Sequence, residues 1–219
     1  MDEQARESAF MSALVTEHFV LQSASSTTVS ESSARASLYL FSLSSALVAM
    51  GFTAQSPDIF RPFVSTVLPA LFVLGWFTVV RLTDTTVENN QFLRAIAHIR
   101  AYYRTLTPQA PAYFVSWQAG SDKAGEDEAA EALAMLGAKS GRATVLFTTA
   151  SMIATINGLV GGAAVALFAA HVLGAANVVA VLLGAAATVA LIAAAYSYQV
   201  RRYSAAAAAD RQRRASQVK

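Results

Sequence analysis

The sequence predicts an all-α integral membrane protein, with four transmembrane helices arranged as two parallel helical hairpins and with additional cytoplasmic amphipathic helices. Two observations predict this class. Of the 219 residues, 55% are hydrophobic and only 14% are charged, whereas soluble domains have roughly a quarter of charged residues. Four stretches without Asp, Glu, Lys or Arg are each about long enough to cross a hydrocarbon core of roughly 30 Å: 36–54, 63–80, 143–170 and 172–195.

The alternation of polar and apolar stretches divides the chain into five segments. We expect an N-terminal cytoplasmic amphipathic helix with a polar lead-in over 1–32, and a first transmembrane hairpin over 33–82. A cytoplasmic helical segment over 83–142 follows. A second transmembrane hairpin over 143–199 then precedes a basic cytoplasmic tail over 200–219.

Within the first segment, residues 4–22 carry one apolar helical face, made of Phe10, Met11, Leu14, Val15, His18 and Phe19. Such a face predicts an amphipathic helix that lies on the membrane or packs against a partner. Residues 23–34 are rich in Ser and Thr. They form either a loop or a polar helical lead-in to the first span, because these side chains compete with helical hydrogen bonds.

Arginine indicates the orientation of the spans. The apolar stretches are flanked at one end by Arg35, Arg81, Arg142, Arg201 and Arg202. The connection over 55–62 at the other end has a single arginine, and that over 169–177 has no Lys or Arg. The positive-inside bias therefore predicts a multi-pass protein of the bacterial inner membrane with both termini in the cytoplasm. Arg35, Arg142, Arg201 and Arg202 are either orientation anchors alone or contacts for lipid phosphate or another anionic ligand.

The middle segment contains a helical pattern over residues 86–106. Apolar residues recur there at steps of four and three, forming a seam of Phe92, Ile96, Ile99, Tyr103 and Leu106. Two and a half heptads are too few to establish a coiled coil. We expect the seam to self-associate or to bind a cytoplasmic protein.

The third span carries a stripe of hydroxyl and glycine residues on one helical side: Thr144, Thr148, Ser151, Thr155, Gly158 and Gly162. Positions 107 residues earlier form a similar line in the first span, with Ser37, Ser44 and Gly51. This similarity predicts an internal duplication of two parallel repeats. The stripe either packs helices closely or provides a wettable lining for a pore.

Asn157 is the most polar side chain within a span. A buried amide needs hydrogen-bond partners, which another helix or a second copy of the chain would supply. The alternative is a position near the outer surface, where water solvates the amide.

Catalytic and cofactor motifs are missing from the sequence. There is no cysteine and none of the usual phosphate-loop, zinc-protease or serine-hydrolase motifs. The three histidines, His18, His98 and His171, lie in different predicted regions, so we expect no metal, no cofactor and no enzymatic activity. A net charge of +2 gives no reason to expect nucleic acid as a partner.

These patterns predict an oligomeric four-span protein in the lipid bilayer. We expect a channel or membrane-perturbing pore that its cytoplasmic helices regulate. The alternative is a non-conducting membrane scaffold or accessory subunit that binds a cytoplasmic partner protein.

Overall fold

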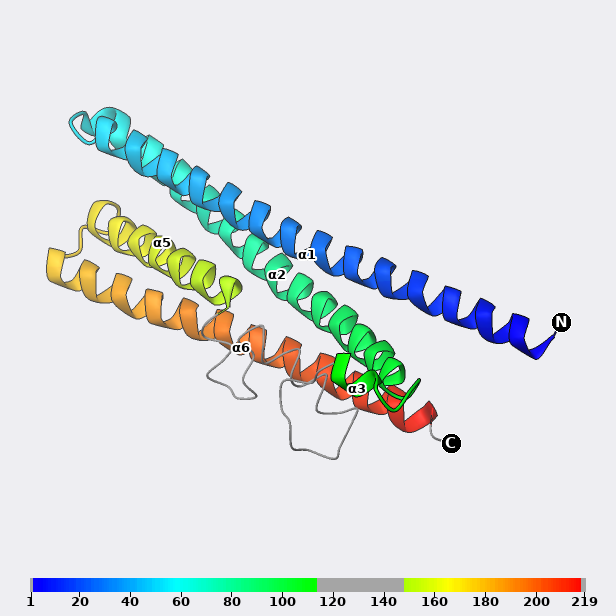
Figure 1. Cartoon of the computed structure of the whole chain (residues 1–219). Coiled ribbons are helices and arrows are strands. Elements are labelled where there is room, and N and C mark those ends of the chain that lie inside the picture. Colours follow the sequence, from blue (N-terminus) through cyan, green and yellow to red (C-terminus); the bar gives the residue numbers. More distant parts are fainter. Residues whose placement is uncertain (1, 114–147, 218–219) are drawn as a thin grey trace. The chain divides into compact units, whose positions relative to one another are not determined.

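The computed structural model describes residues 2–113 and 148–217, and every regular element within them is a helix (Figure 1). The elements are α1 (Glu3–Thr53), α2 (Pro57–Arg104), α3 (Ala110–Tyr113), α5 (Thr149–His171) and α6 (Asn177–Gln217). In this part of the chain, α1, α2, α5 and α6 are long and apolar enough to cross a membrane. The prediction of an all-helical chain with four candidate membrane-spanning helices is therefore confirmed.

Helix α1 is continuous over 51 residues, so the Ser- and Thr-rich residues 23–34 form a helical lead-in and not a loop. Their hydroxyls are accommodated by bonding back within the helix. Thr27 Oγ1 donates to the Ser23 carbonyl at 3.0 Å, and Thr28 Oγ1 donates to the Ala24 carbonyl at 2.8 Å. At 1.5 Å per residue α1 is about 76 Å long, much more than the roughly 30 Å of a hydrocarbon core.

Helix α2 likewise joins the predicted second span and the predicted middle helix into one element of 48 residues. Pro57 occupies its first position, where a missing N–H costs nothing. Pro62 and Pro69 lie inside the helix, which is tolerated in membrane helices because nearby groups can satisfy the freed carbonyls. The helix ends at Arg104, two residues before the end of the predicted helical pattern.

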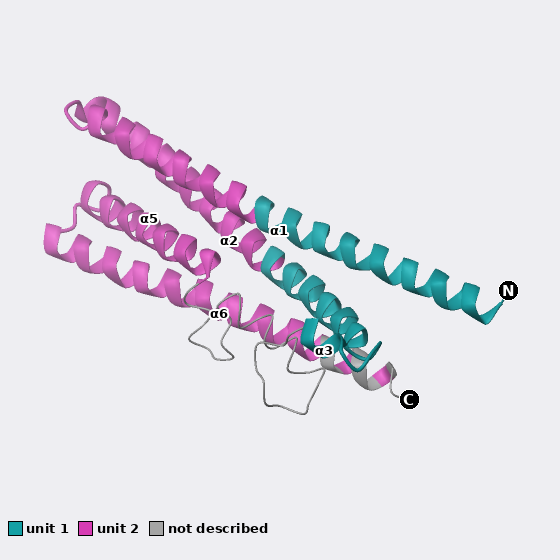
Figure 2. Cartoon of the chain, in the orientation of Figure 1, with its two compact units in different colours: residues 1–31, 85–144 teal, residues 32–84, 145–219 magenta. Residues whose placement is uncertain are grey.

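The chain divides into two compact units (Figure 2). Unit 1 comprises residues 1–31 and 85–144, and unit 2 comprises residues 32–84 and 145–219. Helices α1 and α2 contribute one part of their length to each unit.

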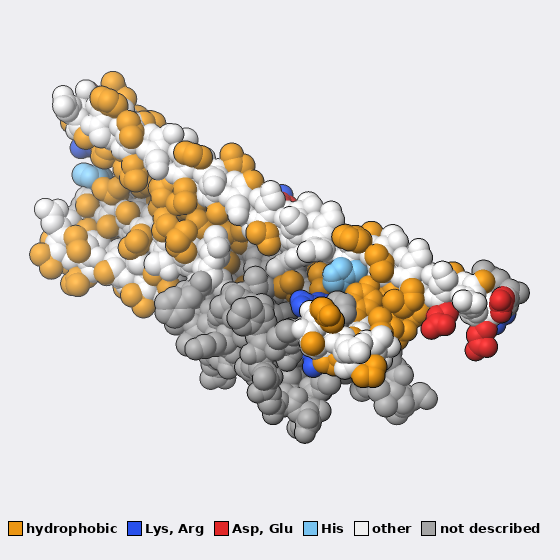
Figure 3. All heavy atoms as spheres, in the orientation of Figure 1, with side chains coloured by type: hydrophobic (Ala, Val, Ile, Leu, Met, Phe, Trp, Pro, Cys, Tyr) orange, Lys and Arg blue, Asp and Glu red, His pale blue; other side chains and the backbone are white. Residues whose placement is uncertain are grey.

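In unit 2, four helices contribute to the hydrophobic core. One buried cluster includes Tyr39 of α1, Val79 of α2, Ile153 of α5 and Ala195 of α6. Large apolar side chains also lie on the surface, such as Phe52 with 81% of its area exposed. Hydrophobic side chains cover much of the visible surface (Figure 3), as expected for helices that face lipid.

In unit 1, the N-terminal part of α1 packs against the C-terminal part of α2. The rings of Phe10 and Tyr102 make an edge contact at 5.7 Å, and those of His18 and Tyr103 lie 6.0 Å apart. Ser25 Oγ donates a hydrogen bond to Asn89 Oδ1 at 2.6 Å. Aromatic and polar contacts therefore both join these two helical segments.

Candidate functional site

The hydroxyl and glycine stripe begins at the N-terminus of α5. Thr148 is the N-cap, and its Oγ1 accepts a hydrogen bond from the backbone N–H of Ser151 at 3.2 Å. Ser151, Gly158 and Gly162 are buried, whereas Thr155 is exposed and donates its hydroxyl hydrogen to the Ser151 carbonyl. Thr144 lies outside the described residues, as does Arg142.

The glycines of the stripe lie against α6. A Cβ atom at Gly162 would collide with the Thr188 side chain and lie 2.6 Å from the Gly184 carbonyl. A Cβ atom at Gly158 would lie 2.7 Å from Ile192 Cγ1. A Cβ atom at Gly184 of α6 would likewise lie 2.7 Å from the Ala166 Cβ atom of α5. These small residues allow the two backbones to pack closely.

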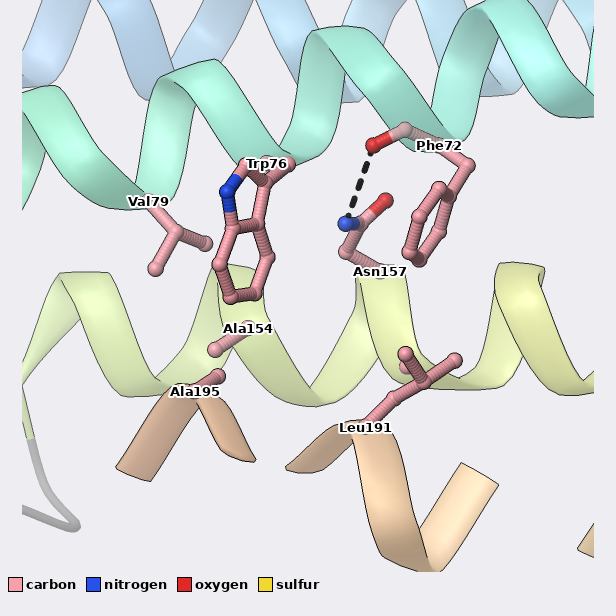
Figure 4. A pocket seen from close by; sticks show the side chains of 8 residues that line it. Phe72, Trp76, Val79, Ala154, Asn157, Leu191 and Ala195 are labelled. Atoms are coloured by element: carbon pink, nitrogen blue, oxygen red, sulfur yellow. Dashed lines mark hydrogen bonds between the residues drawn. The ribbon is translucent and has the colours of Figure 1, made fainter. Parts of the chain in front are cut away.

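Asn157 is buried between three helices, with 2% of its area exposed. Its Nδ2 donates to the Phe72 carbonyl of α2 at 3.1 Å, and its Oδ1 accepts from the Tyr39 hydroxyl of α1 at 3.2 Å. The hydrogen bond to Phe72 is visible in Figure 4. An amide without partners is costly in an apolar environment, so this network stabilises the contact of α5 with both α1 and α2.

Gly75 of α2 makes room for the Asn157 network. A Cβ atom at this position would collide with the Asn157 amide group and lie 2.8 Å from Tyr39 Cε2. Neither Tyr39 nor Gly75 was among the site residues predicted from the sequence. The sequence features that could have indicated them are the phenolic hydroxyl of Tyr39 within the first apolar stretch and the glycine at position 75 within the second.

A small cavity lies beside Asn157, between α2, α5 and α6 (Figure 4). Its volume is about 10 Å³, which is roughly the space for one water molecule. The lining is apolar apart from the asparagine and consists of Phe72, Trp76, Val79, Ala154, Asn157, Gly158, Leu191 and Ala195. The helices around the most polar side chain of the spans are thus closely packed.

Gln199 of α6 forms a second buried polar contact with α5. Its Oε1 accepts a hydrogen bond from Ser151 Oγ at 2.9 Å, and the side chain is 1% exposed. Its Nε2 is buried and has no hydrogen-bond partner. Gln199 was not among the predicted site residues because it lies just beyond the predicted fourth span, 172–195.

Near Gln199, α6 makes two contacts with α2. Arg202 Nε donates to Asp84 Oδ1 at 2.9 Å, and the two side chains are 50% and 28% exposed. The rings of Trp76 and Tyr198 lie 6.4 Å apart. Arg201 is exposed, as is Arg35 on α1.

The line on α1 has surroundings that differ from those of the stripe on α5. Ser37, Ser44 and Gly51 are exposed, and a Cβ atom at Gly51 would meet nothing within 4 Å. Their proposed counterparts Ser151 and Gly158 are buried. Positions that the predicted repeats treat as equivalent therefore differ in burial: exposed on α1 and buried on α5.

The apolar seam of α2 belongs to unit 1. Ile99 and Tyr103 are buried, and Tyr103 contacts His18 of α1. Phe92 and Ile96 are half-buried, and Leu106, which follows the helix end, is exposed. Much of the seam is thus covered within the chain. Among the described residues, no group of three or more His, Asp or Glu residues could hold a metal ion.

No protein-family model matches this chain, and no match was found among curated proteins or solved structures.

Proposed function

We propose that this protein is a non-conducting membrane scaffold or accessory subunit that binds a cytoplasmic partner protein. The observation that supports this proposal best is the use of the α5 stripe in helix packing. Ser151 pairs with Gln199, and Gly158 and Gly162 lie against α6. These residues were the main reason to expect a pore lining.

The Asn157 network supports the same function. Both polar atoms of this amide are engaged within the chain, by Tyr39 and by the Phe72 carbonyl. A side chain that coordinates a permeant species needs to face a water-filled path. The adjacent cavity has a volume of only about 10 Å³, and its lining is apolar apart from Asn157 itself.

Unit 1 supplies the proposed partner-binding surface. Two large apolar side chains one turn apart on α1 are exposed in this unit, Val15 at 43% and Phe19 at 65%. A group of exposed apolar side chains outside the spans gains free energy when a partner covers it. We infer that this partner is a cytoplasmic protein.

The orientation in this proposal rests on arginine. Arg35, Arg81, Arg201 and Arg202 follow or precede spans at the same end, so the positive-inside bias favours a cytoplasmic location for both termini and for unit 1. The inner membrane of a bacterium, two parallel hairpins and an internal duplication complete the proposed arrangement.

Conductance of the purified protein in planar bilayers tests the non-conducting function. We expect no current from the protein. A pore-forming peptide, added as a positive control, should give discrete currents under the same conditions. Currents that depend on the protein and that Ser151→Leu reduces without loss of folding would contradict the proposal.

Binding to a partner is tested by placing a photo-crosslinking amino acid at position 19. We expect one discrete adduct from Phe19 and none from Glu17, an exposed polar residue on the opposite side of the same helix. Phe19→Glu should reduce recovery of the identified adduct partner with the protein. The absence of adducts from positions 15 and 19 would argue against this surface.

A second candidate function is a channel formed by a homo-oligomer. The observation that favours it is the exposure of Ser37, Ser44 and Gly51 on one line of α1, which could surround an axis between copies. In this case Ser44→Leu abolishes conductance, while Ser45→Leu, an exposed neighbour off the line, preserves it.

A further inference from the structure

One side of α1 in unit 1 is exposed and has the residue spacing of a helix-pairing face. Val15, Phe19, Gln22, Ser26 and Val29 follow one another at steps of four and three, and all five are exposed. Such steps place side chains on one line along a helix, where a second helix can pack alongside them. These five residues are called the α1 face below.

The α1 face is separate from the side of α1 that packs within unit 1. That side carries His18, whose ring lies 6.0 Å from the ring of Tyr103, and Ser25, which donates a hydrogen bond to Asn89. The apolar residues of the α1 face are instead between 43% and 65% exposed. Unit 1 therefore leaves this face open to a neighbouring molecule.

The α1 face carries no charge. Between Val15 and Val29, the only Asp, Glu, Lys or Arg residue of α1 is Glu17. A rotation of about 100° per residue places Glu17 on the opposite side of the helix from the face. In a symmetric pair of identical faces each residue meets its own copy, so a charge there would meet a like charge. The absence of charge therefore suits pairing with a second copy of this chain.

The two polar residues of the α1 face also suit an identical neighbour. A glutamine amide contains both donors and an acceptor, and a serine hydroxyl can donate as well as accept. Gln22 and Ser26 can therefore form hydrogen bonds with their own copies across a symmetric interface. Polar residues at such positions fix the register of paired helices.

The proposed membrane orientation limits how two copies can meet. Helix α1 continues from this face into the first predicted span, so copies inserted in the same orientation present their α1 helices in parallel. Insertion to the same depth also brings identical residues to the same level. A face of two heptads is short for a coiled coil, but confinement to one membrane raises the effective concentration of the second copy.

We propose that, in the absence of the cytoplasmic partner, the α1 face binds the α1 face of a second copy of this chain, with the two helices parallel and in register. The partner then binds by displacing the second copy from Val15 and Phe19. This pairing goes beyond the proposed function because it is a property of the protein alone. The purified protein therefore tests it whether or not the proposed partner exists.

Disulfide formation between single introduced cysteines tests this pairing, because the chain has no cysteine of its own. Gln22→Cys and Ser26→Cys place a thiol on the α1 face. Glu17→Cys and Thr27→Cys are the matched controls, because both residues are exposed and lie off the face. In the purified full chain in liposomes, we expect oxidation to link dimers at 22 and 26 at least about tenfold faster than at 17 and 27, since a disulfide needs Cβ atoms roughly 4 Å apart.

A charge introduced on the face provides the second measurement. Phe19→Glu combined with Ser26→Cys should reduce the linking rate to that of the controls, because two carboxylates would meet in the interface. Val20→Glu, at an exposed apolar neighbour off the face, should leave the rate unchanged. Equal rates at all four cysteine positions, or a rate at 26 that Phe19→Glu leaves unchanged, would overturn the proposal. The absence of linked dimers at 22 and 26 would also overturn it and would leave the α1 face to the partner alone.

Discussion

The hydroxyl of Tyr39 on α1 donates a hydrogen bond to the side-chain oxygen of Asn157 on α5, across 3.2 Å. Both side chains are nearly inaccessible, with 1% and 2% of their areas exposed. The two residues are far apart in the sequence. Each satisfies a polar group of the other that would otherwise be buried and unpaired. This relationship makes the contact sensitive to single-atom changes.

Removal of the phenolic oxygen is the first such change. Tyr39→Phe leaves Asn157 Oδ1 without its donor, so we expect the free energy of unfolding to fall by about 1 kcal/mol. Unfolding in mixed micelles measures this effect. Tyr113→Phe is the control because Tyr113 is 83% exposed. A double-mutant cycle with Asn157→Leu should give a coupling energy well above zero, and additive losses would show that the hydrogen bond contributes nothing.

The glycine opposite Asn157 permits a second test. Gly75→Ala places a methyl group on the amide of Asn157 and against the Tyr39 ring, so we expect a loss of roughly 1–3 kcal/mol from overpacking. Gly51→Ala is the matched control, since a Cβ atom there meets nothing within 4 Å. The control should be neutral or stabilising by up to about 1 kcal/mol, the helix propensity difference. Similar effects at both positions would contradict the crowded site at Gly75.

The crossing of α5 and α6 depends on Gly162. Gly162→Ala would force the Thr188 side chain and the Gly184 backbone away, and we expect a loss of roughly 1–3 kcal/mol. Ala163→Val changes the adjacent, exposed residue and should have little effect. Unfolding in mixed micelles measures both effects, and equal losses in Gly162→Ala and Ala163→Val would count against this crossing.

The ion pair of Arg202 and Asp84 should contribute little to the free energy of unfolding. Its side chains are 50% and 28% exposed, and exposed pairs usually stabilise a fold by less than about 1 kcal/mol. We therefore expect Asp84→Asn to lower the free energy of unfolding by no more than about 0.5 kcal/mol. High salt should remove most of this difference. A loss several times larger would mean that the pair is shielded from solvent by lipid.

Sequence patterns were sufficient for the helical class and for the four apolar helices, because uncharged stretches of this length have few alternatives. They were insufficient for the continuity of α1. Ser and Thr at 23–34 favour a loop in isolation, but Thr27 and Thr28 bond back to the helix. Hydrogen bonds from a side chain to the backbone one turn earlier leave no periodic pattern in the sequence.

The partners of the polar residues were also beyond sequence reasoning. Periodicity placed Ser151, Gly158 and Gly162 on one side of a helix, but it could not show that α6 covers that side. It treated Ser44 and Ser151 as equivalents, although one is exposed and the other buried. A helical face is a local property, whereas the neighbour that covers it depends on the whole chain.

The crowding at Gly75 has a consequence for the order in which this protein can change over generations. Its lack of a side chain makes room for both the amide of Asn157 and the ring of Tyr39. A variant that first acquires smaller side chains at 157 and 39 would then tolerate alanine at 75, whereas the reverse order passes through an overpacked intermediate. Descendants of this chain should therefore lose the asparagine before they lose the glycine.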